Sequence, residues 1–336
     1  MASSPALREE YRHSYDHAGR LLGTVYKIND EADVSLNSNQ YDELGRLTTK
    51  KRHNNADTEE FDYNIRNQPT RIKSGTFEQI IGYNTNLLHG ATACCNGNIA
   101  FTSWAHASSI KRGYNYHYDK IGRLTDAYGL YIMSNNSTLP SWGDNELFTY
   151  DKHGNISTLK RRWVSNLVDD LDFVHYNGNQ IMKINDNRGT RNQYLTKEYQ
   201  DYNFEGDDFA YDANGNMTKD FDRRIITIHY NLLNLPDTIQ FRNGRQIVNR
   251  YDASGRKLAS QYFTVHHTLN EPLAQGDILQ LEHSPNMVSE YATFYADNKE
   301  YNYNGNSPGV YQLDKAYNAE GYASNIGSTG GTRYQY

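Results

Sequence analysis

The stretch Tyr41-Asp42-Glu43-Leu44-Gly45-Arg46 belongs to a short repeated motif that decides the fold of this chain. The motif reads Tyr-Asp, two free positions, Gly, and then Arg or Asn, and it lies between stretches in which apolar and polar residues alternate. Its six copies begin at Tyr15, Tyr41, Tyr118, Tyr150, Tyr211 and Tyr251. Weaker copies, with Asn at the Asp or the Gly position, begin at Tyr63, Tyr83, Tyr176 and Tyr230. Such a repeat indicates one supersecondary unit that is used many times.

The Asp and Gly of each copy have the spacing of a type I turn that joins two strands. The carboxylate of Asp can accept hydrogen bonds from backbone N–H groups in the turn, and Gly supplies the positive φ with which the chain leaves it. We therefore predict that each copy is a β-hairpin turn. The predicted structural turn residues are Asp16 and Gly19, Asp42 and Gly45, Asp119 and Gly122, Asp151 and Gly154, Asp212 and Gly215, and Asp252 and Gly255.

The segments between the motifs show the alternation of β-strands. It is plainest in residues 225–262, where Asn243-Gly244 also gives a strong hairpin signal, so we predict a meander there. The nearest candidate for a helix is the short stretch 163–174. The predicted fold class is therefore all-β, with repeated antiparallel hairpins forming a curved or spiral single-layer sheet.

The composition also favours few layers. Only 37% of residues are hydrophobic, Tyr (29) far outnumbers Phe (11), and the mean hydropathy is −0.87. Tyr suits a sheet whose faces are both partly hydrated, because its ring packs while its hydroxyl still reaches a polar partner. We divide the chain into an N-terminal extension (1–10), a repeat region (11–300) and a tail rich in Tyr, Asn and Gly (301–336).

The six motifs resemble those of the YD-repeat proteins, called Rhs (rearrangement hot spot) proteins in bacteria, with relatives in insecticidal toxin complexes and in teneurin receptors. The resemblance covers roughly residues 11–262. It implies a long sheet of hairpins that winds into a hollow shell, which encloses a C-terminal toxin in one branch and is an extracellular scaffold in another. It also implies a secreted or cell-surface protein, although the N-terminus of the given chain lacks the apolar core of a signal peptide.

The chain departs from the toxin branch in one respect. Rhs toxins typically carry an Asp-Pro-x-Gly motif that performs self-cleavage, and no Asp-Pro occurs here. We therefore assign no protease role, predict no catalytic residue and no cofactor, and expect a shell segment.

Charge and cysteine content exclude several classes of partner. A net charge of −6 without a long Lys/Arg run gives no electrostatic footprint for nucleic acid. No apolar stretch is long enough to span a membrane. Cys94 and Cys95 are adjacent, so no disulfide framework is predicted. The remaining partners are a polypeptide cargo, neighbouring shell segments or glycans, and exposed sheet edges are expected to favour self-association.

One loop has the side chains of a calcium site. Asp212, Asn214, Asn216 and Asp220 present oxygen atoms at loop positions 1, 3, 5 and 9, a spacing that could converge on a hard cation. The alternative is that Asp212 serves the turn alone.

Two further functions remain open from the sequence. An extracellular glycan-binding module could use exposed Tyr with Trp104, Trp142 or Trp163, because aromatic faces beside polar groups recognise sugars. A polysaccharide-active enzyme would need two carboxylates that converge in one cleft.

Overall fold

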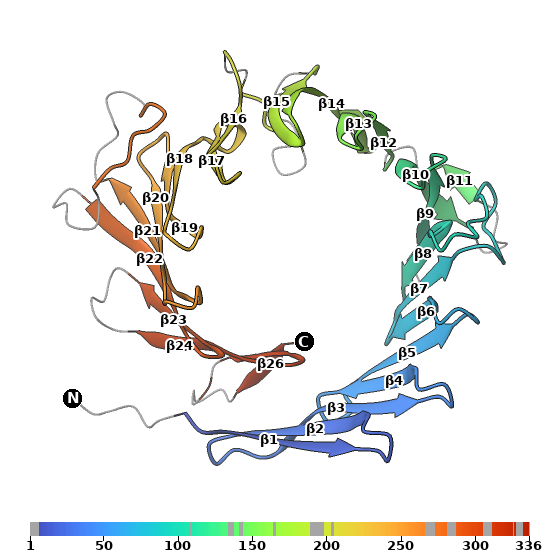
Figure 1. Cartoon of the computed structure of the whole chain (residues 1–336). Coiled ribbons are helices and arrows are strands. Elements are labelled where there is room, and N and C mark those ends of the chain that lie inside the picture. The colour runs from blue at the N-terminus through green and yellow to red at the C-terminus, as the bar shows by residue number, and fades with distance from the viewer. Residues whose placement is uncertain are drawn as a thin grey trace. The chain divides into compact units, whose positions relative to one another are not determined.

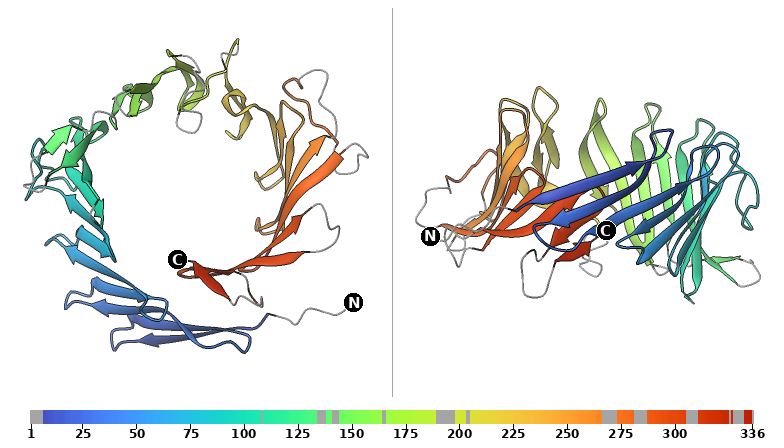
Figure 2. Two further views of the ribbon diagram at one scale, coloured as in Figure 1. Left: turned by 180° about the vertical axis from the view of Figure 1, so that it is seen from behind. Right: turned by 90° about the horizontal axis from the view of Figure 1, so that it is seen from below.

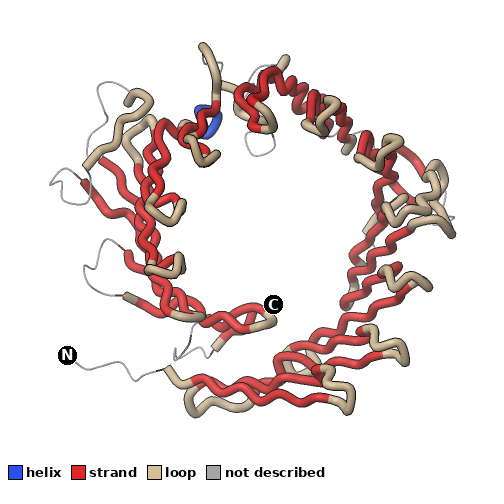
Figure 3. Tube along the Cα trace, in the orientation of Figure 1, coloured by secondary structure: helices blue, strands red, loops and turns tan. Residues whose placement is uncertain are grey.

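The computed structural model describes residues 7–107, 109–133, 138–140, 144–163, 166–188, 198–202, 205–265, 273–280, 287–304, 311–324, 326 and 332–335. Nearly all of the regular structure in these residues is antiparallel β-sheet, as Figure 3 shows. The helical element in this part of the chain is a single 3-10 turn, η1 (Phe221–Arg223). The prediction of an all-β fold built from antiparallel hairpins is confirmed.

The strands form two open sheets, in which neighbours in sequence are almost always neighbours in space (Figure 1). The first sheet has 15 strands in the order β1 to β10 and then β12 to β15, with β11 paired to β10. Its strands are β1 (Glu9–Tyr15), β2 (Leu21–Ile28), β3 (Val34–Tyr41), β4 (Leu47–Arg52), β5 (Asp57–Tyr63), β6 (Pro69–Ser74), β7 (Phe77–Gly82), β8 (Phe101–His106), β9 (Lys111–Tyr118), β10 (Leu124–Ile132), β11 (Thr138–Pro140), β12 (Glu146–Tyr150), β13 (Ile156–Trp163), β14 (Asn166–Asn177) and β15 (Gln180–Asp186).

The second sheet has 11 strands in unbroken sequence order. They are β16 (Phe209–Tyr211), β17 (Met217–Asp220), β18 (Ile225–Tyr230), β19 (Pro236–Phe241), β20 (Gln246–Tyr251), β21 (Lys257–Val265), β22 (Met287–Ala296), β23 (Lys299–Asn304), β24 (Gln312–Asn318), β25 (Gly321–Ser324) and β26 (Arg333–Gln335). The meander predicted for residues 225–262 is present as β18 to β21.

The chain divides into two compact units, Met1–Tyr150 with Thr158–Val168, and Asp151–Ser157 with Asp169–Tyr336. Within each unit, neighbouring hairpins lie side by side in a single layer, as the two views of Figure 2 show. The buried residues of the first hairpins are large. Tyr26, Ile28 and Leu36 have no exposed surface. In the second unit many buried positions are alanines, including Ala316 and Ala323, which pair directly across β24 and β25.

The described residues of the candidate helix, 163 and 166–174, belong to strands. β13 ends at Trp163, and β14 pairs with β15 through Leu171 and Phe173. The register shifts between Phe173 and His175 and again between His175 and Tyr176. Each shift interrupts the period of two at the end of the stretch.

The predicted boundaries of the repeat region fall inside strands. β1 begins at Glu9, and residues 301–336, assigned to a tail, contain the end of β23 and all of β24 to β26. These late strands extend the second sheet without a Tyr-Asp turn. The last Tyr-Asp motif begins at Tyr251, so β22 to β26 all follow it.

Candidate functional site

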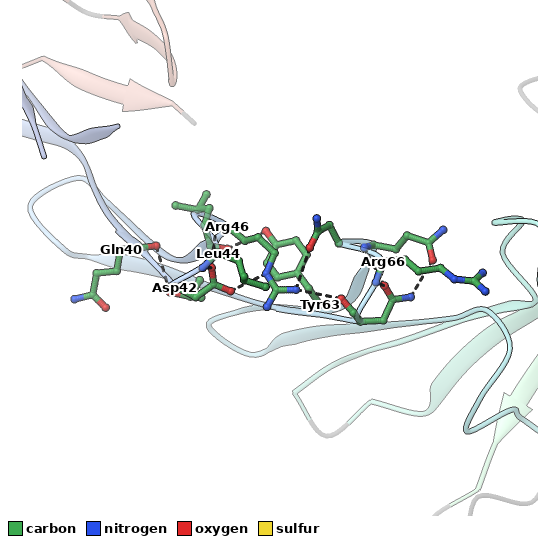
Figure 4. Close-up of polar contacts among 11 residues, drawn as sticks. Gln40, Asp42, Leu44, Arg46, Tyr63 and Arg66 are labelled. Carbon is green, nitrogen blue, oxygen red and sulfur yellow. Dashed lines mark hydrogen bonds and ion pairs between the residues drawn. The ribbon is translucent and has the colours of Figure 1, made fainter. Parts of the chain in front are cut away.

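The turn at Asp42 shows how one motif is built (Figure 4). The Asp42 N–H donates to the carbonyl of Arg46 at 2.9 Å, and the Gly45 N–H donates to the carbonyl of Asp42 at 3.0 Å. Oδ1 of Asp42 accepts from the N–H groups of Leu44 (3.0 Å) and Arg46 (2.9 Å), while Oδ2 accepts from Nε of Arg46 at 2.7 Å. One carboxylate therefore satisfies three donors and fixes both the turn and the arginine.

The other Asp residues of the motif, Asp16, Asp119, Asp151, Asp212 and Asp252, make the same two backbone contacts and bind the Arg or Asn four residues later. The turn glycines have φ between 77° (Gly19) and 94° (Gly154). The register shifts at the tyrosine, for example between Gln40 and Tyr41, so each fully paired turn carries a one-residue bulge. These donors stabilise the charged carboxylate: the hydrogen bond from Arg20 lowers the pKa of Asp16, and that from the Ser254 side chain lowers the pKa of Asp252 to about 2.

In the weaker motifs, Asn side chains form the same turn that Asp and Gly form in the six full copies. Asn64 and Asn231 accept the two backbone hydrogen bonds that Asp accepts elsewhere. Asn67 and Asn234 take the glycine position with φ of 61° and 57°. Asn tolerates this left-handed conformation better than other non-glycine residues, which explains why these degenerate copies still form turns.

From Tyr41 to Tyr251, the tyrosine of each motif connects its hairpin to the preceding one. Its hydroxyl donates to the carbonyl of the residue that follows the preceding turn, and we call this series of contacts the tyrosine ladder. The pairs are Tyr41 to Leu21 (2.9 Å), Tyr63 to Leu47 (2.8 Å), Tyr83 to Pro69 (3.1 Å), Tyr118 to Ile99 (2.9 Å), Tyr150 to Leu124 (2.7 Å), Tyr176 to Ile156 (2.8 Å), Tyr211 to Ile181 (3.0 Å), Tyr230 to Met217 (2.8 Å) and Tyr251 to Pro236 (3.1 Å).

The arginine of the motif completes the connection where it is present. The guanidinium of Arg46 lies 5.1 Å from the ring centroid of Tyr63, and its Nη1 donates to the carbonyl of Asn64 at 3.1 Å. Arg20 over Tyr41 (5.0 Å) and Arg123 over Tyr150 (4.6 Å) repeat the stacking. Each tyrosine is thus held by a hydrogen bond at its hydroxyl, and in these copies also by a cation over its face.

The ladder is half-buried, which makes its hydrogen bonds contribute to stability. Burial raises the pKa of Tyr63, Tyr150 and Tyr230 above the ordinary value, so the phenols keep their protons and remain donors at neutral pH. A hydrogen bond of this kind contributes about 1 kcal/mol. The register pairs Tyr41 with Leu47, the residue that follows the turn.

One turn of the ladder was missed from the sequence. Residues 93–99 read Ala-Cys-Cys-Asn-Gly-Asn-Ile, in which Gly97 has φ of 98° and the carbonyl of Ile99 accepts from Tyr118. Neither Tyr nor Asp is present, so a search for Tyr-Asp could not find this copy. The signal that remains is Asn-Gly-Asn, which also ends the motif at Tyr211.

The structure places the four residues of the predicted calcium loop in other contacts. Asp212 binds the backbone of its own turn, and Nδ2 of Asn216 donates to Asp212 Oδ2 at 2.9 Å. Nδ2 of Asn214 donates to Asn234 Oδ1 at 3.0 Å. Asp220 caps η1 by accepting from the backbone and guanidinium of Arg223. Among the described residues no group of three or more His, Cys, Asp or Glu side chains is arranged to hold a metal ion. Calcium binding stays a prediction.

A cluster of buried carboxylates in the second unit was also missed from the sequence. Its members, which we call the acidic cluster, are between 0% and 7% exposed: Asp169, Asp186, Glu198, Asp201, Asp208, Asp220 and Asp222. Two of them act on the backbone of β15, where Asp208 accepts from the Ile184 N–H (3.0 Å) and Asp201 accepts from the Asp186 N–H (2.9 Å). Asp201 and Asp208 thereby each satisfy a backbone N–H group of β15.

Tyr199 links two members of the acidic cluster. Its N–H donates to Asp169 at 2.6 Å, and its hydroxyl donates to Oδ2 of Asp222. Burial raises the pKa of Asp222 to about 7, the hydrogen bond from Tyr199 opposes this rise, and the charges of Asp208 and nearby carboxylates add to it. Burial likewise raises the pKa of Asp186 and Asp208. This part of the second unit is therefore sensitive to protonation near neutral pH.

The other sequence candidates lie apart from the ladder. Trp104 is in β8, stacked on Tyr114 at 5.7 Å between ring centroids, beside a cavity of about 410 Å³ that Arg112 and His106 also line. Trp142 lies outside the described residues, and of Trp163 the structure describes only the backbone, at the end of β13. Cys94 and Cys95 are free thiols. No helix in the described ranges is long and apolar enough to cross a membrane.

Comparison with known proteins gives matches in structure and none in sequence. No known protein family matches the sequence, and neither does any curated protein. The crystal structure of TcdB2-TccC3-Cdc42 matches over 96% of this chain with a TM-score of 0.60 and 14% identity. The Photorhabdus luminescens Tc holotoxin pore (TM-score 0.58, 14% identity) and the crystal structure of TcdB2-TccC3 (0.58, 15%) match over the same 96%.

The matches cover only part of those proteins. This chain spans about one seventh of the length of the solved chains, 14% of two of them and 15% of the third. At this level of identity the likeness concerns the fold. The resemblance to YD-repeat proteins of insecticidal toxin complexes, predicted from the six motifs, is confirmed as a shared fold.

Proposed function

We propose that this chain is a non-enzymatic YD-repeat shell or scaffold segment, of the kind that encapsulates a C-terminal toxin in Rhs proteins or acts at the cell surface. The observation that carries the proposal is the tyrosine ladder. It joins hairpin to hairpin from Tyr41 to Tyr251 and commits the motif residues to holding neighbours together. The shared fold with Tc toxin structures supports the same reading.

The proposal gives each motif residue a mechanical role. Asp and Gly fix the turn, the turn fixes the register, and the register decides which alternate side chains share a face. A chain with this role would bind a polypeptide cargo or neighbouring shell segments. A secreted or cell-surface location follows from the resemblance to the YD-repeat proteins.

Small-angle X-ray scattering tests the shell role. A solid globule of this length has a radius of gyration of about 20 Å, and an unfolded chain about 65 Å. A shell segment should give a folded profile with a value distinctly above the first and far below the second. A value near the first would mean a compact core and would contradict the proposal. Release of reducing ends from a panel of polysaccharides would contradict its non-enzymatic part.

A glycan-binding module is the second candidate, and the cavity beside Trp104 favours it. The cavity combines an indole with the cationic side chain of Arg112, and a smaller cavity of about 190 Å³ beside it adds Tyr114 and Asp144. An aromatic face flanked by polar groups suits a sugar ring. A glycan array probed with the parent chain and with Trp104→Ala tests this candidate, which requires binding that the substitution abolishes.

A further inference from the structure

A row of unlike side chains crosses one face of the sheet from β7 to β10. The register pairs Gln79 of β7 with Trp104 of β8, Trp104 with Arg112 of β9, and Arg112 with Tyr131 of β10. Side chains of directly paired residues project from the same face. With strands about 4.8 Å apart, this row, which we call the Trp104 row, is about 14 Å long. It has the length of a short oligosaccharide.

Arg112 is the charged member of the Trp104 row. Its side chain is exposed, and its guanidinium lies 5.6 Å from the ring centroid of Tyr131. Arg20 and Arg46 stack on tyrosines in the same way, but each also binds the Asp of its own turn, at 2.6 and 2.7 Å. Arg112 makes no ion pair with any residue that the structure describes. The stack therefore orients a guanidinium whose donors can meet a ligand anion.

Two cavities lie along the row, and Trp104 and Arg112 line both of them. The larger, of about 410 Å³, extends to His106, and the smaller, of about 190 Å³, extends to Tyr114 and Asp144. Tyr114 stacks on Trp104, with ring centroids 5.7 Å apart. The two cavities thus share an aromatic wall and a cation.

The smaller cavity has an acidic side. Gly129 pairs with Tyr114 and has no side chain to fill the space beside that ring. Burial raises the pKa of Tyr114 to about 12, and the charges of Asp144 and Glu146 add to the rise. The Tyr114 hydroxyl therefore keeps its proton, and Asp144 supplies an acceptor for hydroxyl groups of a ligand.

We propose that the Trp104 row binds an oligosaccharide that contains a carboxylated sugar. The inference rests on the glycan-binding candidate and gives the chemistry of its ligand. The sugar ring stacks on the indole, its carboxylate accepts from the Arg112 guanidinium, and its hydroxyls donate to Asp144. A polyanion such as a polyphosphate fits less well, because Asp144 lines the smaller cavity together with Arg112.

Carboxylated sugars occur in polysaccharides with uronic acids and in glycans that end in sialic acid. One probe represents each source: a tetrasaccharide of alternating glucuronic acid and N-acetylglucosamine, and sialyllactose. Their neutral partners are the methyl ester of the tetrasaccharide and lactose. Binding to the full chain is measured by isothermal titration calorimetry. At least one acid should bind about tenfold more tightly than its neutral partner, because a guanidinium–carboxylate pair is a strong hydrogen-bonding contact.

Three variants assign this preference to the row. Arg112→Gln should bind the acid and its neutral partner equally and melt as the parent does, because the guanidinium is exposed. Arg112→Lys keeps the charge and should retain part of the preference. Arg250→Gln, which alters an exposed strand arginine of the second unit, should bind as the parent does. Added NaCl should weaken binding of the acid more than that of its neutral partner.

Equal affinities of acid and neutral partner for the parent chain would overturn the inference, and this comparison needs no variant. A preference that persists in Arg112→Gln would also overturn it. Neutral glycans that bind as tightly as the acids and require Trp104 would leave the glycan-binding candidate standing without this inference. Absence of binding to every probe would overturn both and leave the shell role, which the scattering measurement tests separately.

Discussion

At the scale of the residue, the motif makes two kinds of contact: those of the turn are local in sequence, and those of the tyrosine hydroxyl are distant. The roles of Asp42 and Gly45 follow from the sequence, because a turn is decided by residues within a few positions of each other. The acceptor of each tyrosine could not be predicted. It lies 13 residues away for Tyr230 and 30 for Tyr211, and it depends on the register of intervening strands.

Gly154 allows the backbone conformation to be tested alone. Its φ is 94°, and an added Cβ would meet nothing within 4 Å, so a substitution causes no steric clash. Gly154→Val should lower the free energy of unfolding by about 1–2 kcal/mol, because β-branched residues avoid positive φ. Gly154→Asn should cost less, since Asn67 and Asn234 hold the same position elsewhere. Urea titrations measure both, and equal stability of the two variants would contradict this account.

Tyr63→Phe measures one step of the tyrosine ladder. The substitution removes the hydroxyl that donates to Leu47 at 2.8 Å and keeps the ring beneath Arg46. We expect the free energy of unfolding to fall by about 1 kcal/mol, or somewhat more if the Leu47 carbonyl is left without a partner. Tyr15→Phe is the matched control and should be neutral, because the Tyr15 side chain is 58% exposed and its hydroxyl makes no hydrogen bond to the described residues. A neutral result for Tyr63→Phe would show that the ladder does not stabilise the sheet.

At the scale of the element, the sequence predicts strands where the motif marks their ends. It fails in two places for different reasons. β24 to β26 have no Tyr-Asp turn, and β14 has apolar residues spaced as in a helix, with register shifts at its far end. The acidic cluster could not be predicted either, because Asp201 and Asp208 are buried only where their segment runs along β15. Their charge would otherwise suggest exposure.

The acidic cluster predicts a dependence of stability on pH. Asp222 faces Tyr199, Asp201, Asp208 and Asp220, and its pKa is about 7 when folded, against about 4 for an unfolded Asp. Between these values the folded protein binds more protons than the unfolded one. The contribution of Asp222 to the free energy of unfolding therefore falls as the pH rises from about 4 to about 7.

Asp222→Asn tests this dependence. The amide cannot ionise and still accepts from Tyr199, so the variant should melt several degrees higher than the parent at pH 8 and differ little at pH 5. Glu205→Gln removes an exposed charge near the same segment and should leave the pH profile of the parent unchanged. Calorimetry from pH 5 to 8 measures the melting temperatures. A parent protein whose melting temperature does not change over this range would count against the role of Asp222.

At the scale of the whole molecule, the recurrence of one motif was sufficient to predict the fold class and its relatives in structure. No single copy carries that information, and the 14% identity to the Tc structures shows how little of the remaining sequence is needed for it. What recurs is the set of contacts between one hairpin and the next, which is a property of repeat proteins in general.

Because those contacts join only neighbours, the number of repeats should be variable. The test is a tandem duplication of residues 41–62, inserted before Tyr63. The copied tyrosine at the start of the insert would donate to the original Leu47 carbonyl, and Tyr63 would donate to the carbonyl of the copied leucine. We expect the extended chain to fold with a melting temperature within a few degrees of the parent. A scrambled insert of the same composition should lower it more. Equal losses for both inserts would contradict a modular ladder.

The tyrosine ladder has a direction, and this has a consequence during synthesis. Every hydroxyl of the ladder, from Tyr41 to Tyr251, donates to a hairpin that lies earlier in the chain. On the ribosome, each new hairpin therefore meets an acceptor that has already emerged. The growing sheet can serve as a template for its next strand, so the chain can be completed in the order in which it is translated.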